Sequence, residues 1–431
     1  MSETAQPLGI VPLARPPDAD VELPGSKSET NRALVCAALA VGTSSLRQVL
    51  LADDTEAMLG CLTSLGVDVT VDRDERQVVV QGTSGSLPPG PATLDARMSG
   101  TTARFVAPVL ALGRGRYRLT GHPQLLARPM APSLAALRDL GVTVEDDAAP
   151  GHLPVTVDGS GTLAGGRVAL AADVSSQFMS GLLLAAPCME KGLLVDVTTP
   201  AVSRPYLDLT AAVMRLFGAT VEHAGDTWTV HPGGYRAADL TVEPDASAAS
   251  YFFAAAAICG GRVRVPGLGR TTAQGDLRFV QLLAEMGADV EVSDRWTEVR
   301  GAGELWGVDV DLADLSDTAP TLAVVAACAT GPTRVRGVGF IRRKETDRIA
   351  AIVTELRRCG VDAVEETDGF VVRPAGGGPH GAVVATYDDH RMAMSFAVLG
   401  LRIPGIEIAD PGCVAKTFPD YFEVLDRLRV A

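Results

Sequence analysis

The chain has 431 residues, of which 47% are hydrophobic and 21% are charged, an ordinary balance for a globular protein. This length is enough for two or three domains. The net charge of -14 argues against nucleic acid and acidic membrane surfaces as partners. No apolar stretch reaches the ~18 residues that a membrane-spanning helix needs.

The cysteines and the N-terminal segment both indicate the cytoplasm. The seven cysteines include no C-x-x-C pair, and Cys36, Cys188, Cys259 and Cys328 lie inside apolar segments. Such thiols are typical of reduced cores. Residues 1–10 have neither a cationic start nor an apolar run, so we expect no signal peptide and a cytoplasmic protein.

The first informative stretch is residues 23–32, LPGSKSETNR, which precedes an apolar helix. Ser28 or Thr30 can cap this helix and leave backbone N–H groups pointing forward. Lys27 and Arg32 add positive charge, and Arg32 lies about one turn beyond Ser28. The combination predicts a phosphate-binding helix start. The alternative is an ordinary capped helix with two solvated cations.

Lysine is rare in this chain and occurs where helices are expected to begin. Only four of the 38 basic residues are lysines: Lys27, Lys191, Lys344 and Lys416. Lys191 lies in a turn, but the other three belong to short motifs that open helices. Since Arg serves at most surface positions here, these three sites indicate a need for a compact ammonium group.

A repeat of roughly 70 to 80 residues runs along the chain. Six apolar segments of small residues end at glycine: 33–42, 105–113, 178–192, 251–260, 321–331 and 392–400. Amphipathic helices close at a second set of glycines and lead into strands: Gly66, Gly141, Gly218, Gly287 and Gly360. Each repeat therefore predicts a buried helix, a strand, an amphipathic helix and two strands.

Six such repeats predict an α/β protein with two similar lobes of three repeats each. We expect one lobe to span residues 24–241 and the other to combine residues 1–23 with 242–431. A strand within residues 11–23 is expected to complete a sheet in the last repeat. If equivalent ends of the repeats face one cleft between the lobes, many helix starts converge there.

The helix starts share a composition that suits anions. Capping residues mixed with cations, amides and glycine precede the buried helices at 27–32, 99–104, 173–177, 245–247, 316–318 and 388–391. A second set opens the amphipathic helices at 128–129, 203–206, 344–348 and 416–419. A cation at a helix start costs about 0.3–1 kcal/mol, and bound anions would offset that cost. Plain capping explains 245–247 equally well.

Five motifs in this order resemble the 5-enolpyruvylshikimate-3-phosphate synthase family over essentially the whole chain: LPGSKSxxNR at 23–32, SSQ at 175–177, KETDR at 344–348, DHRM at 389–392 and AKTFPDYF at 415–422. The resemblance implies an inside-out α/β barrel of two lobes, each with three βαβαββ repeats. It also implies transfer of enolpyruvyl from phosphoenolpyruvate to the 5-hydroxyl of shikimate 3-phosphate, in aromatic amino acid biosynthesis.

Carried over by position, the resemblance implies two substrate sites and three catalytic groups. The shikimate 3-phosphate site would comprise Lys27, Ser28, Arg32, Ser175, Ser176, Gln177, Ser203, Asp317 and Lys344. The phosphoenolpyruvate site would comprise Lys27, Gly100, Arg128, Gln177, Arg348, Arg391 and Lys416. The catalytic groups would be Glu345 as proton donor and acceptor, Asp317 as base for the 5-hydroxyl, and Lys27 at the departing phosphate.

These roles have physical reasons and simpler alternatives. Planar Arg forks suit carboxylate and phosphate, and glycine lets backbone approach a ligand. Two carboxyl groups in different environments can divide the acid and base work. Glu345 could instead be a first-turn charge and Asp317 a plain N-cap, while His390 is as easily structural as catalytic. We expect no cofactor and no metal, small-molecule partners only, and a monomer.

Two positions depart from the family pattern. Met98 stands where the family usually has Asn, and Phe340 stands where it often has Asn before Arg343 and Lys344. We expect altered substrate contacts at both. Neither change removes a proposed acid, base or phosphate ligand.

Two other functions remain open from the sequence. The sister family that transfers enolpyruvyl to UDP-N-acetylglucosamine usually has a reactive cysteine before its Arg-Pro dipeptide, but residues 121–127 here have none. A non-catalytic anion-binding paralogue is the other alternative. Intact Glu345, Asp317, Lys27 and Lys416 argue against it, because a binding protein gains nothing from carboxylates among its anion ligands.

Overall fold

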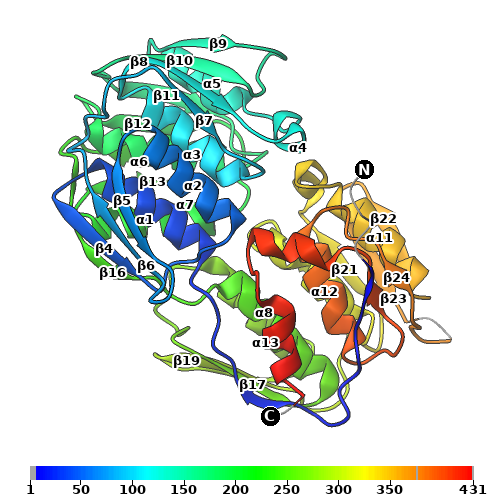
Figure 1. Cartoon of the computed structure of the whole chain (residues 1–431). Coiled ribbons are helices and arrows are strands. Elements are labelled where there is room, and N and C mark those ends of the chain that lie inside the picture. Colours follow the sequence, from blue (N-terminus) through cyan, green and yellow to red (C-terminus); the bar gives the residue numbers. More distant parts are fainter. Residues whose placement is uncertain (1–5, 375–376, 430–431) are drawn as a thin grey trace. The chain divides into compact units, whose positions relative to one another are not determined.

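The computed structural model describes residues 6–374 and 377–429 (Figure 1). The chain forms two compact units, one of residues 25–243 and the other of residues 1–24 together with 244–431. The expectation of no signal peptide concerns residues 1–10, of which 1–5 lie outside the described residues. Within the described part, every helix is too short or too polar to cross a membrane.

The unit of residues 25–243 contains three repeats, drawn from blue to green in Figure 1. Its helices are α1 (Lys27–Leu39), α2 (Asp53–Ser64), α3 (Gly100–Leu110), α4 (Pro123–Leu126), α5 (Ala131–Asp139), α6 (Ser176–Ala185) and α7 (Pro205–Leu216). Its strands are β3 (Ala40–Val41), β4 (Thr43–Arg47), β5 (Asp68–Asp72), β6 (Gln77–Gln81), β7 (Ala92–Asp95), β8 (Arg114–Thr120), β9 (Thr143–Asp146), β10 (Val155–Ser160), β11 (Gly166–Leu170), β12 (Leu193–Val197), β13 (Val221–Ala224), β14 (Thr227–Val230), β15 (Tyr235–Arg236) and β16 (Asp239–Thr241).

The second unit repeats the pattern with shorter elements. Its helices are α8 (Ala246–Cys259), α9 (Phe279–Glu285), α10 (Ala319–Ala326), α11 (Arg348–Arg358), α12 (His390–Gly400) and α13 (Tyr421–Arg427). Its strands are β1 (Leu8–Gly9), β2 (Asp18–Asp20), β17 (Arg262–Pro266), β18 (Asp289–Val292), β19 (Trp296–Arg300), β20 (Asp309–Asp311), β21 (Thr333–Arg336), β22 (Asp362–Glu366), β23 (Gly369–Arg373), β24 (Val383–Val384) and β25 (Glu407–Ile408).

The sheets confirm the βαβαββ repeat. In the second repeat the strand order is β7-β8-β10-β9, with β7 parallel to β8 and the other neighbours antiparallel. The same order recurs in β11-β12-β14-β13 and in β20-β21-β23-β22. In these three repeats the first helix connects the parallel pair of strands, and a hairpin fills the far edge of the sheet.

Two repeats take their first strand from a distant part of the chain. Strand β16 pairs in parallel with β4, and β2 pairs in parallel with β17 of the fourth repeat. The strand expected within residues 11–23 is therefore in the fourth repeat and not the last, whose sheet is completed by β1. Pro12, Pro16 and Pro17 cannot donate ladder hydrogen bonds, so they divide this segment into β1 and β2, and the two strands can pair in different repeats.

The first helix of each repeat forms the core. Helix α8 is almost entirely buried, and it packs against α10 and α12 in its unit, as α3 packs against α6 in the other. Small residues make this close packing possible. A Cβ added at Gly181 of α6 would lie 2.1 Å from the carbonyl oxygen of Arg104 in α3, so only glycine fits there.

Candidate active site

The start of α1 is capped by Ser26, whose Oγ accepts the N–H of Glu29 at 3.3 Å. The cap expected at Ser28 or Thr30 is therefore wrong, because the helix already begins at Lys27 and Thr30 Oγ1 accepts the N–H of Leu50. The earlier cap leaves Lys27 and Ser28 in the first turn, where backbone N–H groups are unpaired within the helix.

Lys27 begins α1 and is held by a carboxylate from α2. Its Nζ lies 3.3 Å from Oδ2 of Asp54, and both side chains are largely buried. The hydroxyl of Thr102 in α3 donates to the backbone carbonyl of Asp54 at 3.1 Å. The starts of α1, α2 and α3 are thereby joined around the Lys27 ammonium.

Arg32 is buried, and its guanidinium is bound by neighbouring helices. Its Nε donates to Thr210 Oγ1 at 2.8 Å, and its Nη1 donates to the carbonyl of Ser28 at 2.8 Å. Its Nη2 donates to Tyr206 O at 3.1 Å and to Ser180 Oγ at 3.4 Å. Burial lowers the pKa of Arg32 to about 10. No carboxylate among the described residues forms an ion pair with it. The centres of the Phe105 and Tyr206 rings lie 5.0 and 5.9 Å from its Cζ.

Gly100 is the first residue of α3 and lies against the guanidinium of Arg128. A Cβ at Gly100 would meet Arg128 Nη2 at 2.9 Å and Cζ at 3.0 Å. Ser99 caps the same helix, because its Oγ accepts from the N–H of Thr102 at 3.2 Å and from the Thr102 hydroxyl at 2.9 Å. The Ser99 hydroxyl, which follows the unusual Met98, is thus used to cap the helix.

Gln177 in α6 is fixed by two residues of α3. Its Oε1 accepts from Arg104 Nη1 at 2.6 Å, and its Nε2 donates to Thr101 Oγ1 at 3.0 Å. Arg104 also donates to the carbonyl of Pro129 at 3.2 Å, next to Arg128. The sequence analysis missed Arg104 as a site residue, although it is the cation of the 99–104 motif. Its side chain connects Gln177, proposed for both substrates, with the backbone next to Arg128, proposed for phosphoenolpyruvate.

Besides Ser28, three predicted serines lie at or next to helix starts. Ser175 caps α6, with its Oγ 3.3 Å from the N–H of Gln177, and Ser176 is the first helical residue. Ser203 is buried with a φ of 54°, in the left-handed region, just before α7. A non-glycine residue in that region carries strain, and such strain concentrates at functional sites.

In the second unit, Arg348 lies among three carboxylates. Its Nε and Nη2 donate to the two oxygens of Asp389 at 2.7 and 3.3 Å. It also donates to Glu345 Oε2 at 2.8 Å and to Asp317 Oδ1 at 3.1 Å. Burial by itself would lower the pKa of Arg348, but these carboxylates outweigh it and raise the pKa. This arginine organises the cluster.

Asp317 bridges two arginines. Its Oδ2 accepts from Arg391 Nη2 at 2.7 Å, while its Oδ1 accepts from Arg348 at 3.1 Å. Arg391 also donates to the hydroxyl of Tyr251 at 3.4 Å. Asp317 lies in a short 3₁₀ helix and does not cap α10. The alternative of a plain helix cap at Asp317 is therefore wrong.

Glu345 is held between two cations. Its Oε2 accepts from Arg348, and its Oε1 lies 3.6 Å from the Nζ of Lys416. Lys416 is buried at the end of a 3₁₀ helix, residues 411–416. The Glu345 carboxylate therefore has a cation on each side and little contact with solvent.

Lys344 is the remaining predicted residue of this unit. Its Nζ lies 5.8 Å from the centre of the Phe340 ring. Such a cation–π contact attracts an ammonium group by about 0.5–1 kcal/mol when exposed. The departure at Phe340 thus places an aromatic face where the family often has an amide, and that face positions the lysine.

The predicted residues form two groups, one in each unit. The first unit brings together Lys27, Ser28, Arg32, Gly100, Arg128, Ser175, Ser176, Gln177 and Ser203 at helix starts. The second joins Asp317, Glu345, Arg348, Arg391 and Lys416 through ion pairs, with Lys344 beside them. The sequence analysis missed Asp389, whose signal was its place before His390-Arg391. His390 is buried, with Nδ1 3.8 Å from Asp389 Oδ1.

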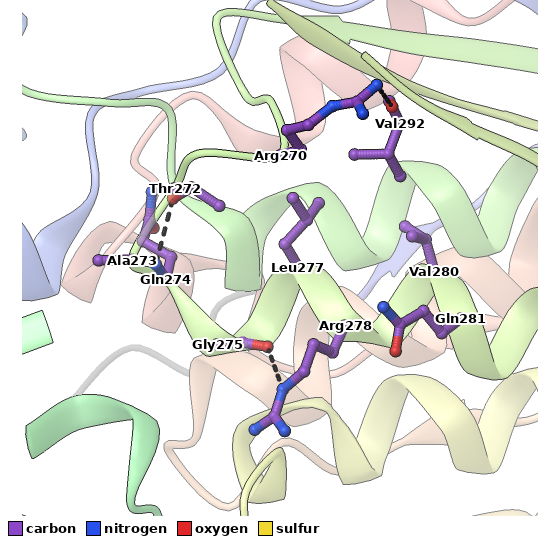
Figure 2. Close-up of a pocket in the computed structure, with 10 residues that line it drawn as sticks. All are labelled: Arg270, Thr272, Ala273, Gln274, Gly275, Leu277, Arg278, Val280, Gln281 and Val292. Atoms are coloured by element: carbon purple, nitrogen blue, oxygen red, sulfur yellow. Dashed lines mark hydrogen bonds between the residues drawn. The ribbon is translucent and has the colours of Figure 1, made fainter. Parts of the chain in front are cut away.

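A separate pocket of about 390 Å³ lies in the second unit, and none of the predicted residues lines it (Figure 2). It has an apolar floor around Leu277 and Val280 and two arginines beside it. These guanidiniums are already ion-paired, Arg270 with Asp294 and Arg278 with Asp314. In residues 6–374 and 377–429 no cluster of three or more His, Cys, Asp or Glu is arranged for a metal.

Comparison with known proteins gives a consistent result. The family model for EPSP synthase (3-phosphoshikimate 1-carboxyvinyltransferase) matches residues 14–425. The chain is 47% identical to a curated 3-phosphoshikimate 1-carboxyvinyltransferase of Nostoc punctiforme, over 96% of this chain and 97% of that one. It is 45% identical to that of Trichormus variabilis, over 96% and 97% of the two chains.

Among solved structures, EPSP synthase of Acinetobacter baumannii superposes with a TM-score of 0.83 at 27% identity, over 98% of both chains. The predicted two-lobe α/β fold is thereby confirmed. The family match over residues 14–425, the close relatives and the shared fold show that the chain belongs to the EPSP synthase family of carboxyvinyltransferases.

Proposed function

We propose that this protein transfers the carboxyvinyl group of phosphoenolpyruvate to the 5-hydroxyl of shikimate 3-phosphate and releases phosphate. The observation that carries the proposal is Glu345 held between Arg348 and Lys416, beside Asp317 between Arg348 and Arg391. In this proposal Glu345 is the proton donor and Asp317 is the base, and both belong to one cluster of ion pairs.

The proposed shikimate 3-phosphate site uses the serines and cations at helix starts. Lys27, Ser28, Arg32, Ser175, Ser176, Gln177 and Ser203 come from one unit, and Asp317 and Lys344 from the other. Arg32 supports this assignment as a buried cation whose hydrogen-bond partners are neutral hydroxyl and carbonyl groups. Helix N-termini favour phosphate and carboxylate groups in the same way.

The proposed phosphoenolpyruvate site uses the arginine forks. Its members are Lys27, Gly100, Arg128, Gln177, Arg348, Arg391 and Lys416. Arg128 lies directly over the start of α3 because Gly100 has no side chain. The guanidiniums of Arg348 and Arg391 are oriented by carboxylates, which pre-organises them for a planar anion.

In the proposed reaction the 5-hydroxyl oxygen attacks C2 of phosphoenolpyruvate, and C3 gains a proton. Asp317 would take the hydroxyl proton, and Glu345 would donate the proton to C3. In the second half Glu345 takes a proton back from C3, the C2–O bond to phosphate breaks, and Lys27 balances the charge of the departing phosphate. General acid–base steps of this kind contribute about 10²–10⁴-fold each.

A phosphate-release assay tests the proposal. Phosphate should appear with both substrates present, and not when either is withheld. Release with UDP-N-acetylglucosamine in place of shikimate 3-phosphate would favour the sister reaction, and no release with either acceptor would favour the anion-binding paralogue. We also propose that the enzyme acts in the cytoplasm. We propose further that it is a monomer, and a mass-resolved size-exclusion measurement tests this oligomeric state.

A further inference from the structure

The chain passes between its two units twice, after Pro24 and after Glu243. Within each unit one backbone hydrogen bond ties the two passing segments together. The N–H of Ser26 donates to Glu243 O at 2.7 Å, and the N–H of Asp245 donates to Pro24 O at 3.0 Å. The two segments are therefore fixed to each other on both sides of the crossing.

Glu29 adds a buried side chain to this arrangement. It is 6% exposed, and its Oε2 accepts the backbone N–H of Glu243 at 2.9 Å. Since Ser26 holds the carbonyl of the same residue, the first turn of α1 binds both backbone groups of Glu243. The N–H of Glu29 itself is capped by Ser26 Oγ at 3.3 Å.

The other unit holds the next residue in a similar way. Gln274, which lines the pocket in Figure 2, donates from Nε2 to the carbonyl of Pro244 at 2.9 Å. Its Oε1 accepts the N–H of Ala246, the first residue of α8, at 3.0 Å. Each side of the crossing is thus bound by one buried side chain from its own unit.

We propose that Glu29 is a positioning residue for the phosphate-binding start of α1, acting through its hydrogen bond to Glu243. The proposal rests on the proposed function, because it takes Lys27 and Ser28 as ligands of shikimate 3-phosphate. Glu29 follows these two residues in the same helical turn. Removing its carboxylate leaves the Glu243 N–H without its acceptor and loosens the turn that carries both ligands.

The carboxyl group of Glu29 also titrates near neutrality. Burial raises its pKa from 4.5 to about 7; the Glu243 N–H lowers the pKa, and the Glu243 side chain raises it. The other charged groups at this helix start are engaged, Lys27 with Asp54 and Arg32 with neutral partners. Because folding favours the protonated form, its contribution to stability is full below about pH 4.5 and is lost as the pH rises to about 7.

Above neutral pH the ionised Glu29 places a negative charge beside the proposed phosphate ligands. Across one helical turn, a partly screened repulsion changes affinity by roughly two- to fivefold. The KM for shikimate 3-phosphate should therefore rise from pH 6 to pH 8 in the wild type. It should rise less in Glu29→Gln, which retains an acceptor for the Glu243 N–H but does not ionise.

The kinetic test compares Glu29→Gln and Glu29→Ala over this pH range. Substrate ionisation is common to all variants, so the ratio of KM values to wild type isolates the contribution of Glu29. Glu29→Ala should raise the KM for shikimate 3-phosphate several-fold at every pH with kcat nearly unchanged. Glu29→Gln should keep this KM close to the wild-type value. Glu56→Gln is the matched control, because Glu56 is a first-turn carboxylate of α2 that pairs with an exposed Arg73. Equal pH profiles for all four proteins would overturn the proposal.

Hydrogen exchange at the Glu243 amide gives a readout that needs no substrate. Exchange should be roughly tenfold faster in Glu29→Ala than in wild type or Glu29→Gln, since one buried hydrogen bond is lost. Faster exchange with unchanged KM would refute the positioning role and leave the proposed function intact. Unchanged exchange would refute the hydrogen-bond basis of the proposal. If the wild type releases no phosphate, the proposed function fails first.

Discussion

Arg348 and Asp389 form a buried two-point ion pair, with Nε–Oδ2 and Nη2–Oδ1 distances of 2.7 and 3.3 Å. The same carboxylate caps α12, because its Oδ1 accepts the N–H of Arg391 at 2.9 Å. One aspartate therefore orients the side chain of one proposed phosphoenolpyruvate ligand and the backbone of another. Asp389 had no place among the predicted site residues.

The substitution Asp389→Asn separates these two roles. Asn caps helices nearly as well as Asp, but it removes the charge that faces Arg348. Removing one partner of a buried ion pair costs about 3–5 kcal/mol, and the remaining carboxylates around Arg348 place the expected loss at the lower end. Urea unfolding measures this loss in the free energy of unfolding. The KM for phosphoenolpyruvate should rise as well. Asp347→Asn is the control: Asp347 caps α11 with a 40% exposed side chain paired to Arg342, so its loss should stay below about 1 kcal/mol.

Glu345→Gln tests the proton donor. The amide keeps the shape and one oxygen for Arg348, but it cannot transfer a proton to C3. We expect kcat to fall by about 10²–10⁴-fold with little change in shikimate 3-phosphate binding by calorimetry. Glu365→Gln is the control, because that carboxylate is 41% exposed and paired with Arg342. A Glu345→Gln enzyme with wild-type kcat would remove Glu345 from the mechanism.

Gly100→Ala tests the contact between α3 and Arg128. The new methyl group would lie 2.9 to 3.1 Å from the Arg128 guanidinium, so that side chain must shift. We expect a several-fold higher KM for phosphoenolpyruvate in steady-state kinetics. Gly60→Ala is the control, since Gly60 lies in α2 with no atom within 4 Å of an added Cβ. It should be neutral or stabilising by about 0.5–1 kcal/mol. Equal KM values would show that Arg128 does not bind this substrate.

The cysteines give a prediction that separates the proposed reaction from its sister reaction. Burial raises the pKa of all seven thiols. The pKa is raised to about 11 at Cys328 and to about 12 at Cys61, Cys188, Cys259, Cys359 and Cys413, and the pKa of Cys36 is raised as well. Under about 1% of each thiol is then ionised at pH 7.5, and the thiolate is the reactive form. Iodoacetamide should leave activity unchanged over an hour. Rapid inactivation, with the label traced by mass spectrometry, would reveal a reactive cysteine near the substrates.

Features that depend on residues close together in the chain were predicted correctly from the sequence. Small apolar segments ending at glycine predicted the buried helices, and the structure has helices at all six of them. Ser99, Ser175 and Asp389 cap α3, α6 and α12 from within the motifs that were singled out. Caps and helical periodicity depend on residues within one turn of each other, which is why sequence alone reveals them.

Long-range pairing was decided only by the folded chain. Local sequence patterns did not predict that β2 would join the sheet of the fourth repeat. They also did not predict that β16 would supply the first strand of the first repeat. Nor could the sequence show that Arg32 is enclosed by Thr210 and Tyr206, residues about 175 positions away. Helix starts follow from neighbouring residues, whereas the partners of a buried charge depend on which elements the hydrophobic core brings together.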